Sequence, residues 1–252
     1  MISYLLIMRT PEPVAEVPPS VPPPSELVNS DSRSVPLAIV LGKTKGENSN
    51  WASDMLPEWT PFIYSVDNEL GYDLHVPNRG NEAMPYLTFI IDHYHSLPDI
   101  IAFMHASRKH RHNQDISEFN DEILRGVNLE FVRKRGYVNL RCKTSPGCEP
   151  SSVLPHNPTD VDIANNDPRA HFADIYATIF ALENVKDVPH VIGGICCAQF
   201  LLTRERILQR PLVDYVRMKS WVLTGSQPLK AGEVGWVFEK IWHVVFGEEA
   251  VL

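Results

Sequence analysis

The sequence predicts an α/β fold, a single domain over residues 36–252 in which helices flank a mainly parallel central sheet. Short apolar runs alternate with segments of helical periodicity, which is typical of parallel sheets because each return crossover contains a helix. The start of the chain differs: eight of the 21 prolines lie in residues 10–36, a composition that does not pack into a core. We therefore expect residues 1–35 to be a disordered Pro-rich tail.

Each expected strand is a short, largely apolar segment near turn-forming residues. The segments are PLAIVL at 36–41, PFIYSV at 61–66, DIIAFMH at 99–105, YVNLR at 137–141, and residues 191–202. The last is unusual because two cysteines and a glutamine interrupt its apolar run.

Each expected helix is marked by an apolar stripe or by end signals. A stripe at helical spacing predicts a helix over residues 81–95, with Pro85 in its first turn. Capping-box spacing and a closing RKRG sequence predict a helix over 115–135. Further helices start at Asp167-Pro168 and at Pro211, and the last covers 235–247.

Charge and cysteine content exclude several classes of protein. A net charge of −8 argues against wrapping nucleic acid over the whole surface, although local basic patches still bind phosphate. No CxxC occurs, so structural zinc is not expected. Adjacent cysteines on a strand point to opposite faces, so Cys196 and Cys197 are expected to be reduced thiols in a cytoplasmic protein. The apolar start MISYLLIM is too short for a membrane span and lacks the basic region of a signal peptide.

Ligands of α/β folds bind at the carboxyl ends of the strands. Those ends are residues 42–44, Asp67-Asn68 and residues 105–107. The sequence LGKT in the first is not a P-loop, because that motif needs a glycine where Leu37 lies. No cofactor is therefore expected. Asp67 and Asn68 are candidate substrate contacts, and His105, at the end of an apolar strand, is a candidate catalytic residue.

Side chains on the expected strand 191–202 should alternate between its two faces. The even-numbered residues from Cys196 to Leu202 form an apolar face, which leaves Cys197 and Gln199 on a face that lines a pocket. The alternative for both cysteines is that they are small buried packing residues.

Carboxylates and histidines on two helices are candidates for catalysis. Glu82, which follows Arg79 into the helix over 81–95, either complements the helix dipole or binds a cationic group and accepts a proton. Glu239 and His243, four residues apart at the edge of the last helix's apolar face, are either an acid–base pair or a surface ion pair. We take Glu82, Glu239 and His243 as catalytic candidates and Arg79 as substrate-binding.

Two basic segments suit contacts with phosphates, with a solvated loop as the alternative for the first. They contain Arg108, Lys109 and Arg111, and Arg204, Arg206 and Arg210. No metal site is expected, because the HxH pair at 93–95 is near a helix end and the DVD sequence at 160–162 follows a loop rather than a strand.

Four blocks of the sequence resemble one family. They are NRGNEAMPYLTFIIDHYHSLPDIIAFMHASRKHRHN, GYVNLRC, CCAQFLLTRERILQRP and EKIWHVVFGE. Together they resemble a large fungal family long classified as a domain of unknown function, whose members include arginine-containing cyclodipeptide synthases. The resemblance covers roughly residues 36–248.

The resemblance implies a catalytic domain that takes arginyl-tRNA and a second aminoacyl-tRNA and releases a cyclo-arginyl-Xaa diketopiperazine, a natural product. Aminoacyl esters are already activated, so no ATP site is required. A guanidinium calls for a carboxylate in a confined site. Glu82 or Glu239 would supply it, and the other, or His243, would act as the base. The tRNA would lie over both basic segments.

Two other functions stay open. The strand-turn-helix pattern near 195–208 and the C-terminal WxxVFG sequence also suit a nucleotide-sugar glycosyltransferase. The sheet is accordingly expected to be Rossmann-like or glycosyltransferase-A-like. A non-catalytic RNA-binding module would instead bind without turnover.

Overall fold

The computed structural model describes residues 36–113, 116–141, 143–145, 147–148 and 151–252, so the expected tail at 1–35 lies outside the described residues. Within them, a six-stranded sheet has the order β3-β2-β1-β4-β6-β5. The strands are β1 (Leu37–Lys43), β2 (Thr60–Ser65), β3 (Leu74–His75), β4 (Ile100–His105), β5 (Tyr137–Asn139) and β6 (Phe200–Thr203).

The sheet is mixed but mainly parallel, as the sequence predicted. β1 pairs in parallel with β2 and β4, and β2 pairs in parallel with β3. β6 runs antiparallel to β4 and β5. The antiparallel β6 and the order 4-6-5 distinguish this sheet from the doubly wound order 3-2-1-4-5-6.

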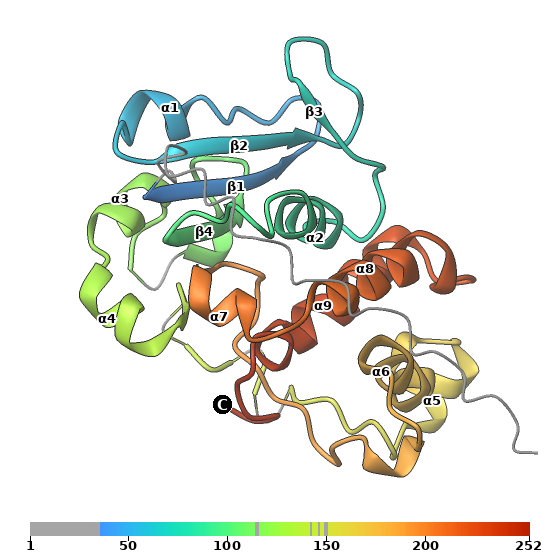
Figure 1. Ribbon diagram of the computed structural model, residues 1–252. Coiled ribbons are helices and arrows are strands. Elements are labelled where there is room, and N and C mark those ends of the chain that lie inside the picture. Colours follow the sequence, from blue (N-terminus) through green and yellow to red (C-terminus); the bar gives the residue numbers. More distant parts are fainter. Residues whose placement is uncertain (1–35, 114–115, 142, 146, 149–150) are drawn as a thin grey trace, which may run out of the picture. The chain divides into compact units, whose positions relative to one another are not determined.

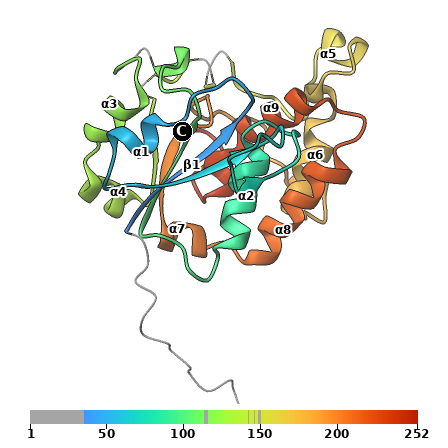
Figure 2. The same cartoon turned by 90° about the horizontal axis from the view of Figure 1, so that it is seen from above.

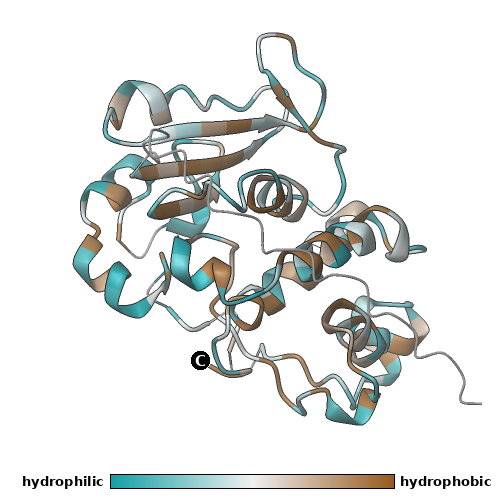
Figure 3. Ribbon diagram, in the orientation of Figure 1, coloured by the Kyte–Doolittle hydropathy of each residue, from teal (hydrophilic) through white to brown (hydrophobic). Residues whose placement is uncertain are grey.

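Helices cover both faces of the sheet, and Figure 2 shows α1, α3 and α4 on one side with α2 and α8 on the other. Alternate residues of β1 enter different cores: Ala38 and Val40 pack with α2, α8 and α9, whereas Ile39 and Leu41 pack with α1, α3 and α4. A strand covered on both faces is apolar throughout, and β1, β4 and α2 are accordingly largely brown in Figure 3.

The helices of the first core follow the predicted periodicity. They are α2 (Ala83–Asp92), α6 (Phe172–Phe180), α8 (Leu212–Ser220) and α9 (Ala231–Val245). Asp167 caps the 3₁₀ turn η2 (Pro168–His171) that leads into α6, as the Asp-Pro signal predicted. The last helix starts four residues earlier than expected, at Ala231, where Glu233 bonds back to the N-H of Lys230.

The helices of the second core are short, and the first of them was not predicted from the sequence. They are α1 (Trp51–Met55), α3 (Asn120–Arg125) and α4 (Leu129–Arg135). The single helix predicted over 115–135 is wrong: Gly126 ends α3, and Asn128 caps α4 with its side chain. Asp115 lies outside the described residues. The predicted end is confirmed, since Gly136 follows Arg135 with a φ of 78°.

The prediction of a strand over 191–202 is confirmed only for its last residues, which form β6. Cys197 and Ala198 have φ values of 88° and 49°, in the left-handed region that no strand contains. Cys196 and Cys197 form a disulfide with each other. The prediction of reduced thiols is therefore wrong for this pair, because the turn removes the alternation that would keep the sulfur atoms apart.

Residues 160–164 and 204–208 form two further short helices. The DVD sequence lies in the short helix α5 (Asp160–Ala164), where Asp162 and Thr159 form a capping box. None of the described helices is long and apolar enough to cross a membrane. The second of these helices, α7 (Arg204–Leu208), follows β6 directly (Figure 1).

Candidate active site

The carboxyl ends of three neighbouring strands border a small cavity, as the sequence predicted. The order β2-β1-β4 places these ends side by side. The cavity has a volume of about 180 Å³ and is lined by Gly42, Thr44, Glu47, Val66, Asn78, Asn81, Glu82, His105 and Ala106. A Cβ on Gly42 would lie 2.6 Å from Cγ of Pro85, so this glycine lets the start of α2 approach β1 closely. That approach sets Glu82 against the cavity.

Glu82 and His105 form a hydrogen-bonded pair in this cavity. Glu82 is the N-cap residue of α2, but its side chain does not cap the helix. Its Oε1 instead lies 2.8 Å from Nδ1 of His105, the last residue of β4. Burial alone would raise the pKa of Glu82, but the hydrogen bond and charge of His105 outweigh it and hold the pKa below its usual range. Glu82 is therefore an ionised carboxylate.

Gln199, in the segment that leads into the neighbouring strand β6, supports the backbone of His105. This buried amide accepts a hydrogen bond from the backbone N-H of His105 at 3.3 Å and donates one to Oδ1 of Asn113 at 2.5 Å. Asn113 donates in turn to Asn120, which donates to the carbonyls of His105 and Ser107. The chain of amides fixes the backbone on both sides of the histidine.

Glu239, on α9, is near enough to Glu82 and His105 for their charges to shift its pKa, although it does not line the cavity. The backbone N-H of Cys197 donates a hydrogen bond to it. Its carboxylate oxygen and the sulfurs of Cys196 and Cys197 lie within 4.8 Å of one another. Burial raises the pKa of Glu239, and the negative charge of Glu82 raises it further, against smaller opposing effects from Lys240, the Cys197 N-H and His105. Glu82 and Glu239 thus have pKa values shifted in opposite directions.

Two more histidines contact His105. The ring of His110 stacks on it with centroids 3.9 Å apart, and Nδ1 of His112 lies 3.2 Å from its Nε2. Burial and repulsion from His105 lower the pKa of His110 to about 3 and that of His112 to about 4. Both rings are therefore neutral at neutral pH.

The structure does not bring His243 into this cluster. Its Nε2 contacts the carbonyl of Ala250 at 3.1 Å, and Gly194 packs against its ring, where a Cβ would lie 2.2 Å from Nδ1. Burial lowers the pKa of His243. In these contacts His243 attaches the C-terminal segment to α9.

Three predicted substrate-binding residues have contacts away from Glu82. Asp67 accepts hydrogen bonds from the Lys45 backbone and the Asn78 side chain, and these bonds lower its pKa. Asn68 is exposed, in a turn with φ 52°. Arg79 donates to the carbonyls of Val222 and Leu229 and to the hydroxyl of Ser226.

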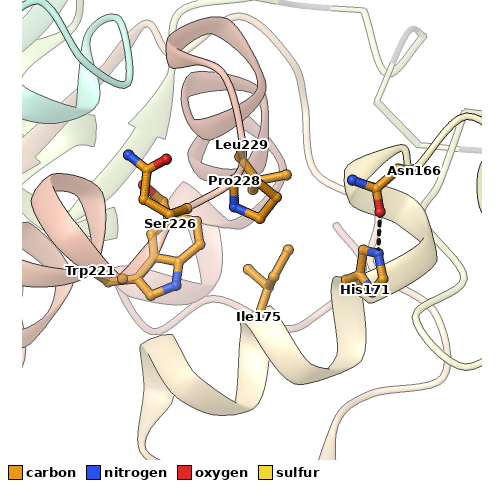
Figure 4. A pocket seen from close by; sticks show the side chains of 9 residues that line it. Asn166, His171, Ile175, Trp221, Ser226, Pro228 and Leu229 are labelled. Carbon is orange, nitrogen blue, oxygen red and sulfur yellow. Dashed lines mark hydrogen bonds between the residues drawn. The ribbon is translucent and has the colours of Figure 1, made fainter.

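Behind Arg79 lies a second cavity of about 350 Å³, between the η2–α6 segment and residues 221–229 (Figure 4). Its walls are mainly apolar, with Ile175, Trp221 and Pro228 facing one another, and His171 bonds to Asn166 at its edge. None of the predicted catalytic residues lines it.

The two basic segments lie at opposite ends of β4. Antiparallel pairing places Thr203 beside Ile100, so that Arg204 pairs with Asp99 at 2.7 Å before the strand begins. Residues 108–111 follow the other end of the strand, about 17 Å away at 3.3 Å per residue. Arg206 and Arg210 are also engaged within the chain, with Glu248 and Asp214.

The first basic segment is partly paired. Arg108 pairs with the buried Asp121 at 2.7 Å, and Lys109 pairs with Glu118 at 2.7 Å. Arg111 is exposed. This segment directly follows His105 and is therefore the basic surface adjacent to the site.

Sequence reasoning missed several residues of the site. Asn120 was hidden inside one predicted long helix and Asn113 at the end of the basic segment, and no local pattern signals the buried hydrogen bonds that they form. Glu47 lines the cavity and accepts bonds from Thr44 and Ser107. Arg141 contacts both sulfurs of the disulfide, which no periodicity reveals.

Comparison with known proteins gives one finding. No curated protein and no solved structure shows significant similarity to this chain. The family described as "Protein of unknown function (DUF3431)" matches residues 39–252, which include β1 from Ile39 onward, the other five strands and the whole of the candidate active site. The chain therefore belongs to the DUF3431 family.

Proposed function

We propose that this protein is an aminoacyl-tRNA-dependent cyclodipeptide synthase that joins arginine to a second amino acid and releases a cyclo-arginyl-Xaa diketopiperazine. The observation that carries the proposal is the pair of carboxylates around His105. One has a lowered pKa and the other a raised one, and two titratable groups with pKa values pushed apart are a sign of divided catalytic roles.

The ionised Glu82 is suited to bind the arginine side chain. It lines the 180 Å³ cavity together with Glu47, and only one of its oxygens is engaged by His105. A guanidinium in a confined site is recognised by a carboxylate through charge-assisted hydrogen bonds. Asn78 and Asn81 add amide groups to the same wall.

Glu239 is suited to be the base. A carboxyl group whose pKa is raised toward neutrality accepts protons more effectively than an ordinary one. In the first step, the α-amine of one aminoacyl-tRNA attacks the ester carbonyl of the other; a C–N bond forms, the ester C–O bond breaks, and Glu239 passes the amine proton to the departing tRNA hydroxyl. In the second step, the free amine of the dipeptidyl-tRNA attacks its own ester carbonyl in the same way, which closes the ring and releases the second tRNA.

The size of the cavity favours an amino-acid side chain over a nucleotide sugar. At about 180 Å³ it is smaller than the about 300–1,000 Å³ of sites for drug-sized ligands. The DVD sequence, a candidate metal motif for a glycosyltransferase, is part of the exposed helix α5 and lines none of the described cavities around His105.

The acceptor end of a tRNA would reach the site past Arg108, Lys109 and Arg111. This segment follows His105 directly, and Arg111 is exposed. The arginines of 204–210 lie at the far end of β4 and are held by carboxylates and carbonyls of the chain. We therefore assign the tRNA contact to the first segment.

The roles of the two carboxylates are tested by Glu82→Gln and Glu239→Gln, with Glu130→Gln on the surface of α4 as the matched control. Loss of Glu82 should raise the KM for arginyl-tRNA by about 30-fold or more, since truncating one partner of a desolvated charge pair costs at least about 2 kcal/mol. Loss of Glu239 should lower kcat by about 10²–10⁴-fold. Unchanged arginine-dependent product formation in both variants would overturn the assignment.

A further inference from the structure

His105, His110 and His112 form a cluster whose ring nitrogens converge. One nitrogen from each lies within 4.8 Å of the others. Nε2 of His105 and Nδ1 of His112 are 3.2 Å apart. In a tetrahedral site with metal–nitrogen bonds of about 2.0–2.1 Å, neighbouring nitrogens are about 3.4 Å apart. One edge of such a site is already present.

The surroundings of His105 are those of a metal ligand. Glu82 holds Nδ1 of its ring at 2.8 Å, which leaves Nε2, the nitrogen that faces His112 at 3.2 Å, for the metal. Ligating histidines in proteins characteristically bond a carboxylate through the nitrogen that does not bind the metal, because this fixes the ring and increases its basicity.

The segment that carries the other two histidines is held in place. The amide of Asn120 bonds the carbonyls of His105 and Ser107, and the N-H of Asn113 bonds the carbonyl of His110. Gln199, which directly precedes β6, fixes Asn113. The turn from β4 into the 3₁₀ helix η1 (Arg111–Asn113) is therefore tied at both ends, and it returns His110 and His112 to the end of the strand.

We propose that His105, His110 and His112 bind one divalent transition metal ion, with zinc as the best match, and leave its fourth position open. Three imidazoles without a carboxylate suit zinc, cobalt, nickel or copper rather than magnesium or calcium. Three protein ligands and an open position are the arrangement of catalytic zinc sites. The half-buried ring of His110 stacks on His105 and accepts the N-H of His112 at Nδ1, and it turns out of that stack to reach the ion.

This inference does not depend on the proposed function. An ion on Nε2 of His105 would lie one imidazole away from Glu82 and so beside the substrate cavity. There it would polarise a carbonyl oxygen or a bound water as a Lewis acid. His110 and His112 come from the segment that the sequence predicted to be basic. Binding of the ion can be measured without any assay of enzymatic activity.

The experiment is a titration of the metal-free full-length protein with Co²⁺ and Zn²⁺, followed by visible absorption and by metal analysis after dialysis. The wild type should bind one equivalent and give the intense visible bands of tetrahedral cobalt. His110→Asn and His112→Asn should weaken binding at least 100-fold. Glu82→Gln should weaken it by about 10–100-fold, the usual loss when such a partner is removed.

The matched control is His95→Asn, an exposed histidine of the other HxH sequence, which should keep the full equivalent. Melting temperatures of all variants identify any loss that comes from unfolding. Three results would overturn the proposal: no stoichiometric cobalt in the wild type, binding that survives in both His110→Asn and His112→Asn, or a thiolate-to-cobalt charge-transfer band. The last would place the ion on cysteine thiolates, such as Cys196 and Cys197 after reduction of their disulfide, beside Glu239.

Discussion

The amide of Gln199 offers the most quantitative test of how the site is held. It accepts the N-H of His105 at 3.3 Å and donates to Asn113 at 2.5 Å, and all three groups are buried. Replacing it by methionine keeps the length of the side chain and removes both bonds. The N-H of His105 and Oδ1 of Asn113 are then buried without a partner.

Each orphaned group costs about 1–3 kcal/mol, and methionine offsets part of this by apolar burial. We therefore expect Gln199→Met to lower the free energy of unfolding by about 3 kcal/mol. In a domain of this size about 1 kcal/mol corresponds to about 2–4 °C, so the expected fall in Tm is about 6–12 °C. Thermal unfolding followed by circular dichroism measures it.

A double-mutant cycle with Asn113→Leu isolates the bond between the two amides. Once Asn113 is gone, the methionine at 199 no longer leaves its carbonyl unpaired, so the two losses should not add. A coupling of about 1–2 kcal/mol is expected for residues in direct contact within one network. A fall in Tm below 2 °C for Gln199→Met, or strictly additive losses, would refute the view that this amide chain supports His105.

Three further predictions concern charge, packing and tRNA. Because the pKa of Glu239 is raised in the folded state, the native protein binds this proton more tightly than the unfolded chain, and stability is lost as pH rises through the raised pKa. The Glu239→Gln variant should not show that loss, so its Tm should exceed the wild-type Tm at pH 8 and match it near pH 4. Parallel curves of Tm against pH for the two proteins would contradict a raised pKa of Glu239. Gly194→Ala should lower the free energy of unfolding by about 1–3 kcal/mol, because its Cβ would lie 2.2 Å from Nδ1 of His243. The control Gly232→Ala, with open space around it, should not lower it. Urea unfolding measures both. Replacing Arg108, Lys109 and Arg111 together by alanine should reduce the slope of log K for tRNA binding against log salt concentration by up to about 2. Arg204→Gln should leave this slope unchanged. Equal effects of the two changes would reject the assignment of the tRNA contact to residues 108–111.

The architecture was predictable wherever a local pattern and the final structure agree. β1, β2 and β4 are apolar on both faces because helices cover both sides, and the sequence contains those runs at nearly the observed bounds. The position of the site followed from the same reasoning, since the ends of adjacent strands meet at one edge. His105 was proposed in this way and Glu82 from its place in the first turn of a helix, and the structure places the two side chains in contact.

The sequence misled where tertiary bonds override local pattern. The segment before β6 has the composition of a strand, but a disulfide between neighbours and two residues with positive φ turn it. Gln199 still faces His105, for a reason other than strand alternation. The direction of β6 could not be read from periodicity, and it is this direction that carries Arg204 to the far end of the sheet.

The convergence of histidines has a similar origin. His110 and His112 belong to a segment that looked like a solvated basic loop, and only the return of the chain through η1 sets them on His105. Periodicity describes a helix or a strand, and it says nothing about a turn that is held by buried amides.

The most direct test of the proposed chemistry is expression of the protein in a host without such a pathway, followed by mass spectrometry of the culture for cyclic arginyl dipeptides. We predict a cyclo-arginyl-Xaa product in cells with the wild-type protein and its loss in cells with the folded Glu239→Gln variant. Folded wild-type protein without any arginine-containing cyclic dipeptide, in cells that contain arginyl-tRNA, would contradict the account.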